Sequence, residues 1–183
     1  NKVFERKKFE YLTEKQLQGE SILAIDFDFR YNTVIKERQH TEEHITDIIG
    51  EVAQLLNKHL IIEGGSKFQV NVFEKPNVNL LDDVTKDGIH MIIGIQTDRI
   101  TQEILRSRII ERLPEIWSDI PITNNWEDVY DHGITAGTVN WQLYGSKKPD
   151  HEKYDLTNVF TYKYDESDDC LLYTSPSPRD RSS

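Results

Sequence analysis

The stretch AIDFDFRY at residues 24–31 places two carboxylates two positions apart in a run that otherwise favours a β-strand. Side chains alternate along a strand, so Asp26, Asp28 and Arg30 are predicted to share one face, and the apolar residues between them take the other. The two carboxylates would lie roughly 7 Å apart at Cα. An exposed edge strand, an ion pair with Arg30 or a divalent cation would compensate their charge. Mg²⁺ and Mn²⁺ suit the last arrangement because these hard ions prefer oxygen ligands.

A histidine lies near the start of a second apolar run, KDGIHMII at residues 86–93. Alternation puts His90 on the same face as Ile92, and Gly88 permits a close approach of another chain segment. A histidine in this position is either a structural residue with a satisfied ring or a donor to a phosphate group.

The segment YGSKKP at residues 144–149 follows a predicted strand. The hydroxyl of Ser146, the ammonium groups of Lys147 and Lys148 and exposed backbone N–H groups suit phosphate oxygens, although a solvated turn has the same composition. Upstream, Asp131 ends the short segment VYD and would return a third carboxylate to the face that carries Asp26.

Secondary structure patterns indicate which elements must position these side chains. Thr41 is suited to cap a helix, and Pro114 is expected to bend or end a second one. Strands are predicted over 21–29, 68–73, 89–95, 141–145 and 156–164, long helices over 41–62 and 98–113, and a short helix within 124–131. This order favours an α+β domain in which helices pack on one face of a mixed or antiparallel sheet.

Composition narrows the class of protein further. The 183 residues carry a net charge of −10, which disfavours non-specific binding to a phosphate backbone and suits a site that gathers cations. A single Cys allows no internal disulfide and favours a reducing compartment. No apolar run is long enough to span a membrane, and the first residues contain neither a secretory signal nor an initiator Met. Residues 170–183 differ in composition from the 1–169 domain and are interpreted as a non-native, adapter-derived or disordered tail.

AIDFDFRY, KDGIHMIIGI and VYD followed by WQLYGSKKPDHEKYDLT, in this order, resemble the archaeo-eukaryotic primase (AEP) domain. The likeness extends over residues 21–165 and is strongest to the primase–helicases of nucleocytoplasmic large DNA viruses, as in asfarvirus, poxvirus and mimivirus relatives. It implies a core related to the RNA-recognition fold. It also implies divalent metal binding by Asp26, Asp28 and a third acid, which is Asp131 or its competitor Asp128.

The resemblance implies a role for the remaining candidates as well. His90 would contact the phosphates of an incoming nucleotide, and Arg30, Ser146, Lys147 and Lys148 would lie near the triphosphate or the template. Many relatives carry Ser two residues before this histidine. Gly88 stands there in this chain, so Lys86 or backbone N–H groups would have to replace the hydroxyl.

The implied activity is a two-metal nucleotidyltransferase that uses Mg²⁺ or Mn²⁺ to make primers from nucleoside triphosphates on a single-stranded DNA template. A C-terminal helicase portion and a viral replication site in the host cytoplasm are implied too. Whether the primer is RNA or DNA stays open. Two other functions fit the same carboxylates less specifically: a metal-dependent nuclease and a non-catalytic replication-binding module.

Overall fold

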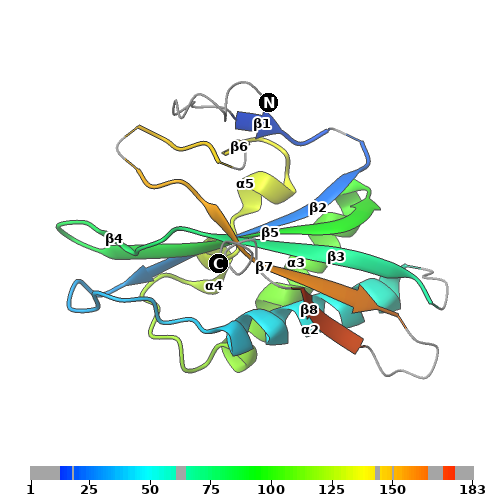
Figure 1. Cartoon of the computed structure of the whole chain (residues 1–183), viewed down its shortest axis with the longest axis horizontal. Helices are drawn as coiled ribbons and strands as arrows, with labels where there is room; N and C mark the ends of the chain where they lie inside the picture. The colour runs from blue at the N-terminus through cyan, green and yellow to red at the C-terminus, as the bar shows by residue number, and fades with distance from the viewer. Residues whose placement is uncertain are drawn as a thin grey trace.

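A computed structural model of the chain describes residues 13–17, 19–60, 65–142, 145–149, 151–164 and 171–175, the last five by their backbone. Its centre is an antiparallel sheet. Five strands lie in the order β2 (Ser21–Tyr31), β5 (Thr85–Thr97), β3 (Lys67–Glu74), β7 (Asp155–Lys163) and β8 (Leu171–Ser175), and β4 (Asn79–Leu80) also pairs with β5. The helices α2 (Glu42–His59) and α3 (Arg99–Ile116) lie on one side of this sheet (Figure 1). The expected α+β architecture is confirmed, and of its two alternatives the sheet is antiparallel.

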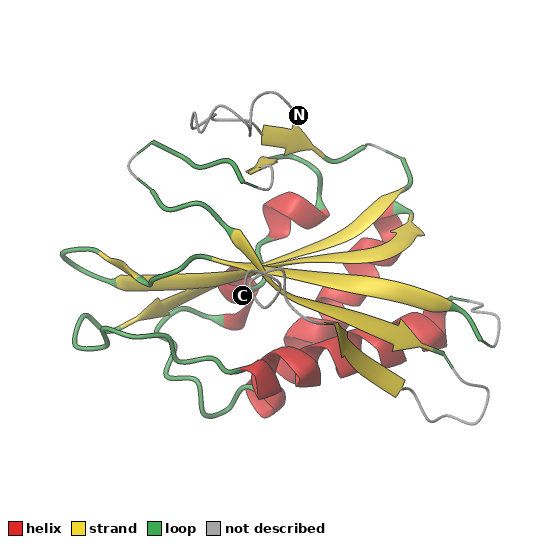
Figure 2. Cartoon of the chain, viewed as in Figure 1, coloured by secondary structure: helices red, strands yellow, loops and turns green. Residues whose placement is uncertain are grey.

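Smaller elements lie on the other side. The short helix α5 (His132–Thr135) and a two-stranded sheet of β1 (Thr13–Lys15) and β6 (Asn140–Gln142) stand opposite α2 and α3 (Figure 2). The remaining short helix, α4 (Trp126–Val129), leads into α5. The elements β1, β4 and α5 have no counterpart in the sequence-based expectation, because two to four residues carry too little periodicity to be recognised.

The two long helices begin where the sequence predicts, next to Thr41 and Asp98. Thr41 caps α2: its hydroxyl accepts from the backbone N–H of His44, whose ring Nδ1 accepts from the backbone N–H of Thr41 in return. Asp98 caps α3 in the same way by accepting from Thr101. The expected end of α3 at residue 113 is wrong, since the helix continues through Pro114 to Ile116. The N–H of Trp117 bonds to the carbonyl of Leu113, and the buried Trp117 ring closes this last turn.

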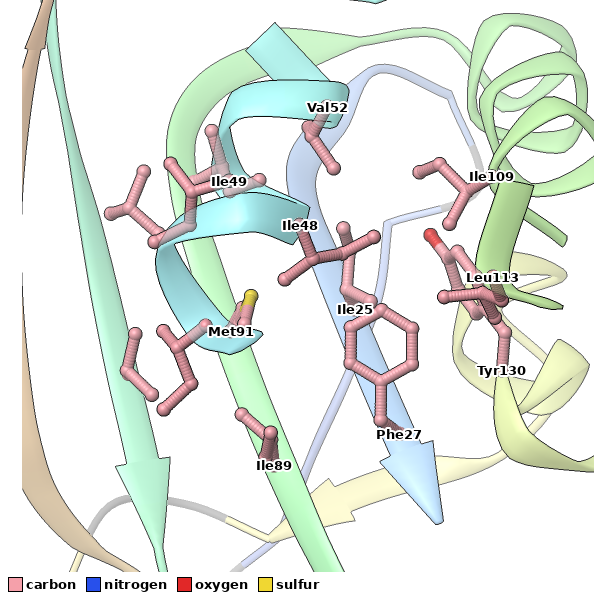
Figure 3. Close-up of a cluster of buried hydrophobic side chains, with 14 of the residues drawn as sticks. Ile25, Phe27, Ile48, Ile49, Val52, Ile89, Met91, Ile109, Leu113 and Tyr130 are labelled. Atoms are coloured by element: carbon pink, nitrogen blue, oxygen red, sulfur yellow. The ribbon is translucent and has the colours of Figure 1, made fainter. Parts of the chain in front are cut away.

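The hydrophobic core fills the space between the sheet and these helices (Figure 3). Each fully buried Ile, Leu or Phe side chain contributes about 1.5–3 kcal/mol to this face. Its labelled members are Ile25 and Phe27 of β2, Ile89 and Met91 of β5, Ile48, Ile49 and Val52 of α2, Ile109 and Leu113 of α3, and Tyr130. The predicted apolar face of β2 is therefore confirmed.

The face of β2 that points away from α2 and α3 carries Asp26, Asp28 and Arg30, and the outer edge of this strand is not open. Strand register pairs Asp26 with His90, Asp28 with Gly88 and Arg30 with Lys86, so all of these residues face away from α2 and α3. On the outer side of β2, the segment of residues 123–131 takes up the strand's free carbonyls. Thr123 N–H donates to Arg30 O at 2.7 Å, and Asp131 N–H donates to Asp26 O at 2.9 Å. The fold thereby attaches the third acid beside the first.

Residues 170–183, which differ from the rest of the chain in composition, include a strand. Residues 171–175 form β8, which pairs antiparallel with β7. The residues LLYTS favour a strand, and β7 offers them an unpaired edge, while the interpretation of residues 170–183 as a non-native or disordered tail stays a prediction. Residues 176–183 lie outside the described part of the chain.

Candidate active site

Four carboxylates line one hollow of about 440 Å³, and three of them belong to the predicted acids; the fourth, Asp87, is ion-paired with Arg38. Asp26 and Asp28 come from β2, and Asp131 is the N-cap residue of α5. The Asp131 carboxylate is oriented locally, because its Oδ1 accepts from the N–H of Gly133 at 3.0 Å. Asp128 does not line this hollow; it lies in the first turn of α4, where its Oδ2 accepts from the side chain of Asn125. Of the two candidates for a third acid, only Asp131 joins the pair.

Asp26 is the most enclosed of the three and contacts two rings. Its Oδ2 accepts from the indole N–H of Trp141 at 3.2 Å, and its Oδ1 lies 3.3 Å from Nε2 of His90. The same indole N–H lies 3.3 Å from His90 Nε2. When that nitrogen accepts from Trp141 it has no proton to offer, and Asp26 Oδ1 is then a buried acceptor without a donor among the described residues. Protonation of His90 converts the contact into an ion pair.

The charge of this cluster is incompletely compensated. Burial raises the pKa of Asp28 from 3.8 to about 6, with further upward contributions from the nearby Asp26 and Asp131 carboxylates, against the opposing effects of His90 and Lys75. Asp28 is exposed as a whole residue and lines the hollow, whereas its carboxylate is crowded by protein atoms, and this desolvation is the largest cause of its raised pKa. Repulsion of this kind is relieved by a proton or by a cation.

The ring of His90 is held between two aromatic residues. Tyr154 stacks on it with ring centroids 3.6 Å apart, and Trp141 lies on it at 4.5 Å. Burial and the surrounding carboxylates raise the pKa of Tyr154 well above its ordinary value, so its hydroxyl keeps its proton and stays a donor. This arrangement fixes the plane of the imidazole and leaves it little rotational freedom.

Gly88 is required by the close approach of β2 and Tyr154. A Cβ atom at this position would lie 2.8 Å from the carbonyl oxygen of Phe27 and 3.3 Å from the Tyr154 hydroxyl. The space that a serine side chain would need is therefore taken. The Tyr154 hydroxyl stands in that space, a donor that was not considered from the sequence.

Besides His90, four basic side chains line the same hollow: Lys75, Lys86, Lys148 and His151. Among the other predicted phosphate contacts, Arg30 is exposed, Ser146 is buried and Lys147 is intermediate, and none of the three lines the hollow. The structure therefore brings together Asp26, Asp28, Asp131, His90 and Lys148 from the predicted set, and separates Arg30, Asp128, Ser146 and Lys147 from them.

The most informative residues that sequence reasoning missed are Lys75, Trp141 and Tyr154. Trp141 and Tyr154 both fall in the motif segment around YGSKKP, where an aromatic residue beside a predicted histidine site was the available signal. Lys75 follows a strand directly and offered no signal beyond its position at a strand end.

The carboxylate oxygens at the site suit a hard cation, but the described side chains are not already arranged around a metal position. In the parts of the chain that the structure describes, no three His, Cys, Asp or Glu side chains are arranged to hold a metal ion. The acceptor position on Asp26 Oδ1, the raised pKa of Asp28 and the all-carboxylate donor set fit Mg²⁺ or Mn²⁺. Rotation of the carboxylates within the hollow is needed to bring them around one ion.

An antiparallel sheet with its two long helices on one face and converging carboxylates on the other defines an α+β domain with an acidic site. Comparison with known families makes the class specific. Residues 1–160 match the family described as the C962R protein N-terminal AEP domain. The chain therefore belongs to this AEP family, and at family level it is a primase-type nucleotidyltransferase domain.

A viral relative agrees with this assignment. Over 154 residues the chain is 30% identical to "Putative helicase L207/L206" of Acanthamoeba polyphaga mimivirus. The aligned region covers 82% of this chain but 16% of that protein, so the chain corresponds to a small part of its relative. Separately, no helix in the described residues combines the length and the apolar character needed to cross a membrane.

Proposed function

We propose that this chain is the catalytic module of a metal-dependent nucleotidyltransferase that synthesises primers from nucleoside triphosphates on a single-stranded DNA template. The observation that carries the proposal is the convergence of Asp26, Asp28, Asp131 and His90 in one hollow with Lys86 and Lys148. A nuclease would use similar carboxylates, but the family match favours strand synthesis.

Asp26, Asp28 and Asp131 would hold Mg²⁺ or Mn²⁺, with Asp26 Oδ1 and the carboxylate of Asp28 as the first ligands. When bound, such ions lower the pKa of a 3′-hydroxyl and neutralise charge on the departing pyrophosphate. Ionisation of Asp28 is part of metal binding, because its pKa of about 6 must fall as the cation arrives.

The remaining side chains bind and orient the substrate. His90, which contacts Trp141 and Tyr154, would donate to a phosphate oxygen through its ring, and Lys86 and Lys148 would offset triphosphate charge. The Tyr154 hydroxyl provides a neutral donor beside Gly88. Arg30, Ser146 and Lys147 do not line the hollow and would contact the template.

The name of the mimivirus relative supports a helicase portion as a partner of this module. A helicase portion attached to this module would supply part of the affinity for DNA, which offsets the net charge of −10. The proposed place of action is a viral replication site in the host cytoplasm.

The test is template-dependent synthesis of labelled oligonucleotides with Mg²⁺ or Mn²⁺. We expect Asp26→Asn and Asp28→Asn each to lower the rate by about 100- to 1,000-fold, because each removes a metal ligand and its charge. Asp128→Asn is the matched control, an acid from the same region of the fold that does not face the hollow, and it is expected to retain the wild-type rate. Undiminished synthesis by Asp28→Asn refutes the proposed role, and shortening of labelled single strands in place of extension favours a nuclease.

A further inference from the structure

Arg106 is a buried arginine of α3 that binds main-chain carbonyls and does not line the hollow. Its Nε and Nη2 donate to the carbonyl oxygen of Tyr130 at 3.0 and 2.8 Å, and Nη2 also donates to that of Glu127 at 2.8 Å. The guanidinium lies over the Tyr130 ring, 5.6 Å from its centroid. The Glu127 carboxylate lies 3.1 Å away, but that side chain is 68% exposed, so solvent weakens the ion pair. The arginine is therefore held mainly by two carbonyls at the end of α4, which have no partner within that helix.

The peptide group between Tyr130 and Asp131 is bonded on both sides. Its carbonyl oxygen accepts from Arg106, and its N–H donates to the carbonyl oxygen of Asp26 at 2.9 Å. Because a peptide group is planar, these two contacts fix the direction of the chain where the Asp131 side chain begins. The N–H of Gly133 then orients the carboxylate itself. Arg106 thus acts one peptide group away from a candidate metal ligand, from the side that faces away from the hollow.

Two further side chains of α3 hold the segment on the other side of Asp131. Arg99 and Glu103 precede Arg106 by seven and three positions, so the three lie on one face of the helix. Arg99 donates to the last carbonyl of α5, and a carboxylate oxygen of Glu103 lies 3.0 Å from Nε2 of His132. One face of α3 therefore contacts the chain both before and after the third acid. Of these three residues, Arg106 contacts the peptide group that adjoins Asp131.

We propose that Arg106 is a positioning residue for Asp131 and, through it, for the divalent cation. The inference rests on the proposed function in one respect, which is that Asp131 is a metal ligand. Groups that orient a ligand from outside the coordination sphere contribute to metal affinity. The sign of the effect separates positioning from charge. Loss of a positive charge near a cation site strengthens cation binding, whereas loss of the orientation of a ligand weakens it.

The experiment measures the Mn²⁺ affinity of the full chain and its variants by electron paramagnetic resonance. We expect Arg106→Met to weaken Mn²⁺ binding by about 10- to 100-fold, the usual effect of removing a group that orients a metal ligand. In the Asp131→Asn background the same substitution should cause little further loss, because the ligand that it orients is already gone. Arg108→Met is the matched control and should keep the wild-type affinity. Arg108 lies on the same helix, its ion pair with Glu111 is exposed, and its loss changes the net charge equally.

A purely structural arginine predicts a different result. If Arg106 only stabilised the fold, its loss would lower the unfolding temperature and leave the Mn²⁺ affinity of the folded protein unchanged. Circular dichroism therefore accompanies each titration, at a temperature where the variants are folded. If Arg106→Met does not fold, Arg106→Lys replaces it, since lysine keeps the charge but lacks the planar fork that bonds to both carbonyls. This variant is expected to bind Mn²⁺ more weakly than wild type, and only when Asp131 is present.

Three outcomes separate the positioning role from the proposed function. Wild-type Mn²⁺ affinity in folded Arg106→Met, or in Arg106→Lys where it replaces that variant, overturns the positioning role, and so does an equal loss with and without the Asp131 carboxylate. If Asp131→Asn itself keeps the wild-type affinity, Asp131 is not a ligand, and that part of the proposed function fails together with the inference. If all variants bind Mn²⁺ as expected but wild type synthesises no oligonucleotide, the proposed activity fails and the role of Arg106 stands.

Discussion

Two clusters of carboxylates in this chain differ in how their charges are compensated. In the first, Arg38 contacts Asp87 through Nε at 3.0 Å and Glu74 through Nη1 at 3.1 Å, and His40 contacts Glu74 at 2.7 Å. Thr157 donates to the second oxygen of Glu74. Although burial alone would raise it, the pKa of Glu74 is lowered by these partners.

The second cluster has the opposite balance. Asp26, Asp28 and Asp131 face the hollow, and the pKa of Asp28 is raised to about 6. The comparison teaches that burial alone does not distinguish a structural carboxylate from a functional one. What distinguishes them is direct contact with a permanent cation: Arg38 contacts Glu74 and Asp87, whereas among the described residues no lysine forms an ion pair with Asp26, Asp28 or Asp131. The compensated cluster ties β3 and β5 to the connection before α2, and the uncompensated cluster needs a ligand from outside.

The largest expected effect tests the compensated cluster. Arg38→Met leaves Glu74 and Asp87 buried without their shared cation, and breaking a buried ion pair in this way costs about 3–5 kcal/mol. Urea unfolding followed by circular dichroism measures the loss. The control is Arg112→Met, whose ion pairs lie at the surface and contribute at most about 1 kcal/mol. Equal losses in the two variants would show that the two environments do not differ as argued.

A smaller effect is the stabilisation of the folded protein by a divalent cation bound at Asp26, Asp28 and Asp131. At a Mn²⁺ concentration of about 100 times Kd, binding to the folded state stabilises it by about 2.7 kcal/mol. Wild type is expected to show this gain in thermal unfolding at pH 7, and Asp28→Asn and Asp131→Asn are expected to lose most of it. Asp128→Asn should keep the full gain because Asp128 does not line the hollow. A gain that survives in Asp28→Asn would place the ion elsewhere.

The smallest effect is a pH dependence. Because the folded pKa of Asp28 lies above its unfolded value of 3.8, its contribution to stability is present below about pH 4 and is lost as the pH rises through about 6. Asp28→Asn removes this loss and should be more stable than wild type at pH 7 by about 1 kcal/mol, a value reduced for the partial exposure of the carboxylate.

Unfolding free energies of both proteins between pH 4.5 and 7 measure this difference. Glu74 does not interfere in this range, since its lowered pKa withdraws stability only as the pH falls below its unfolded value of 4.5. Parallel pH profiles for wild type and Asp28→Asn would contradict the raised pKa.

Local patterns in the sequence were sufficient for several features of the fold and the site. Alternation in AIDFDFRY correctly assigned Asp26 and Asp28 to one face and Phe27 to the other, and Thr41 was recognised as a helix cap. These features depend on neighbours within a few positions, so a single strand or helical turn determines them.

Tertiary structure alone decided the composition of the site. A backbone hydrogen bond to Asp26 holds Asp131 beside the pair, and Asp131 lines the hollow whereas Asp128 does not. The fold also brings Lys75 to the hollow and leaves Arg30 outside it. It also filled the space at Gly88 with the Tyr154 hydroxyl. The sequence by itself determined which residues could take part, because side-chain chemistry and strand periodicity are local properties. Their meeting depends on strand register and chain return over as many as 128 positions between Asp26 and Tyr154, and those are set by the packing of the whole core.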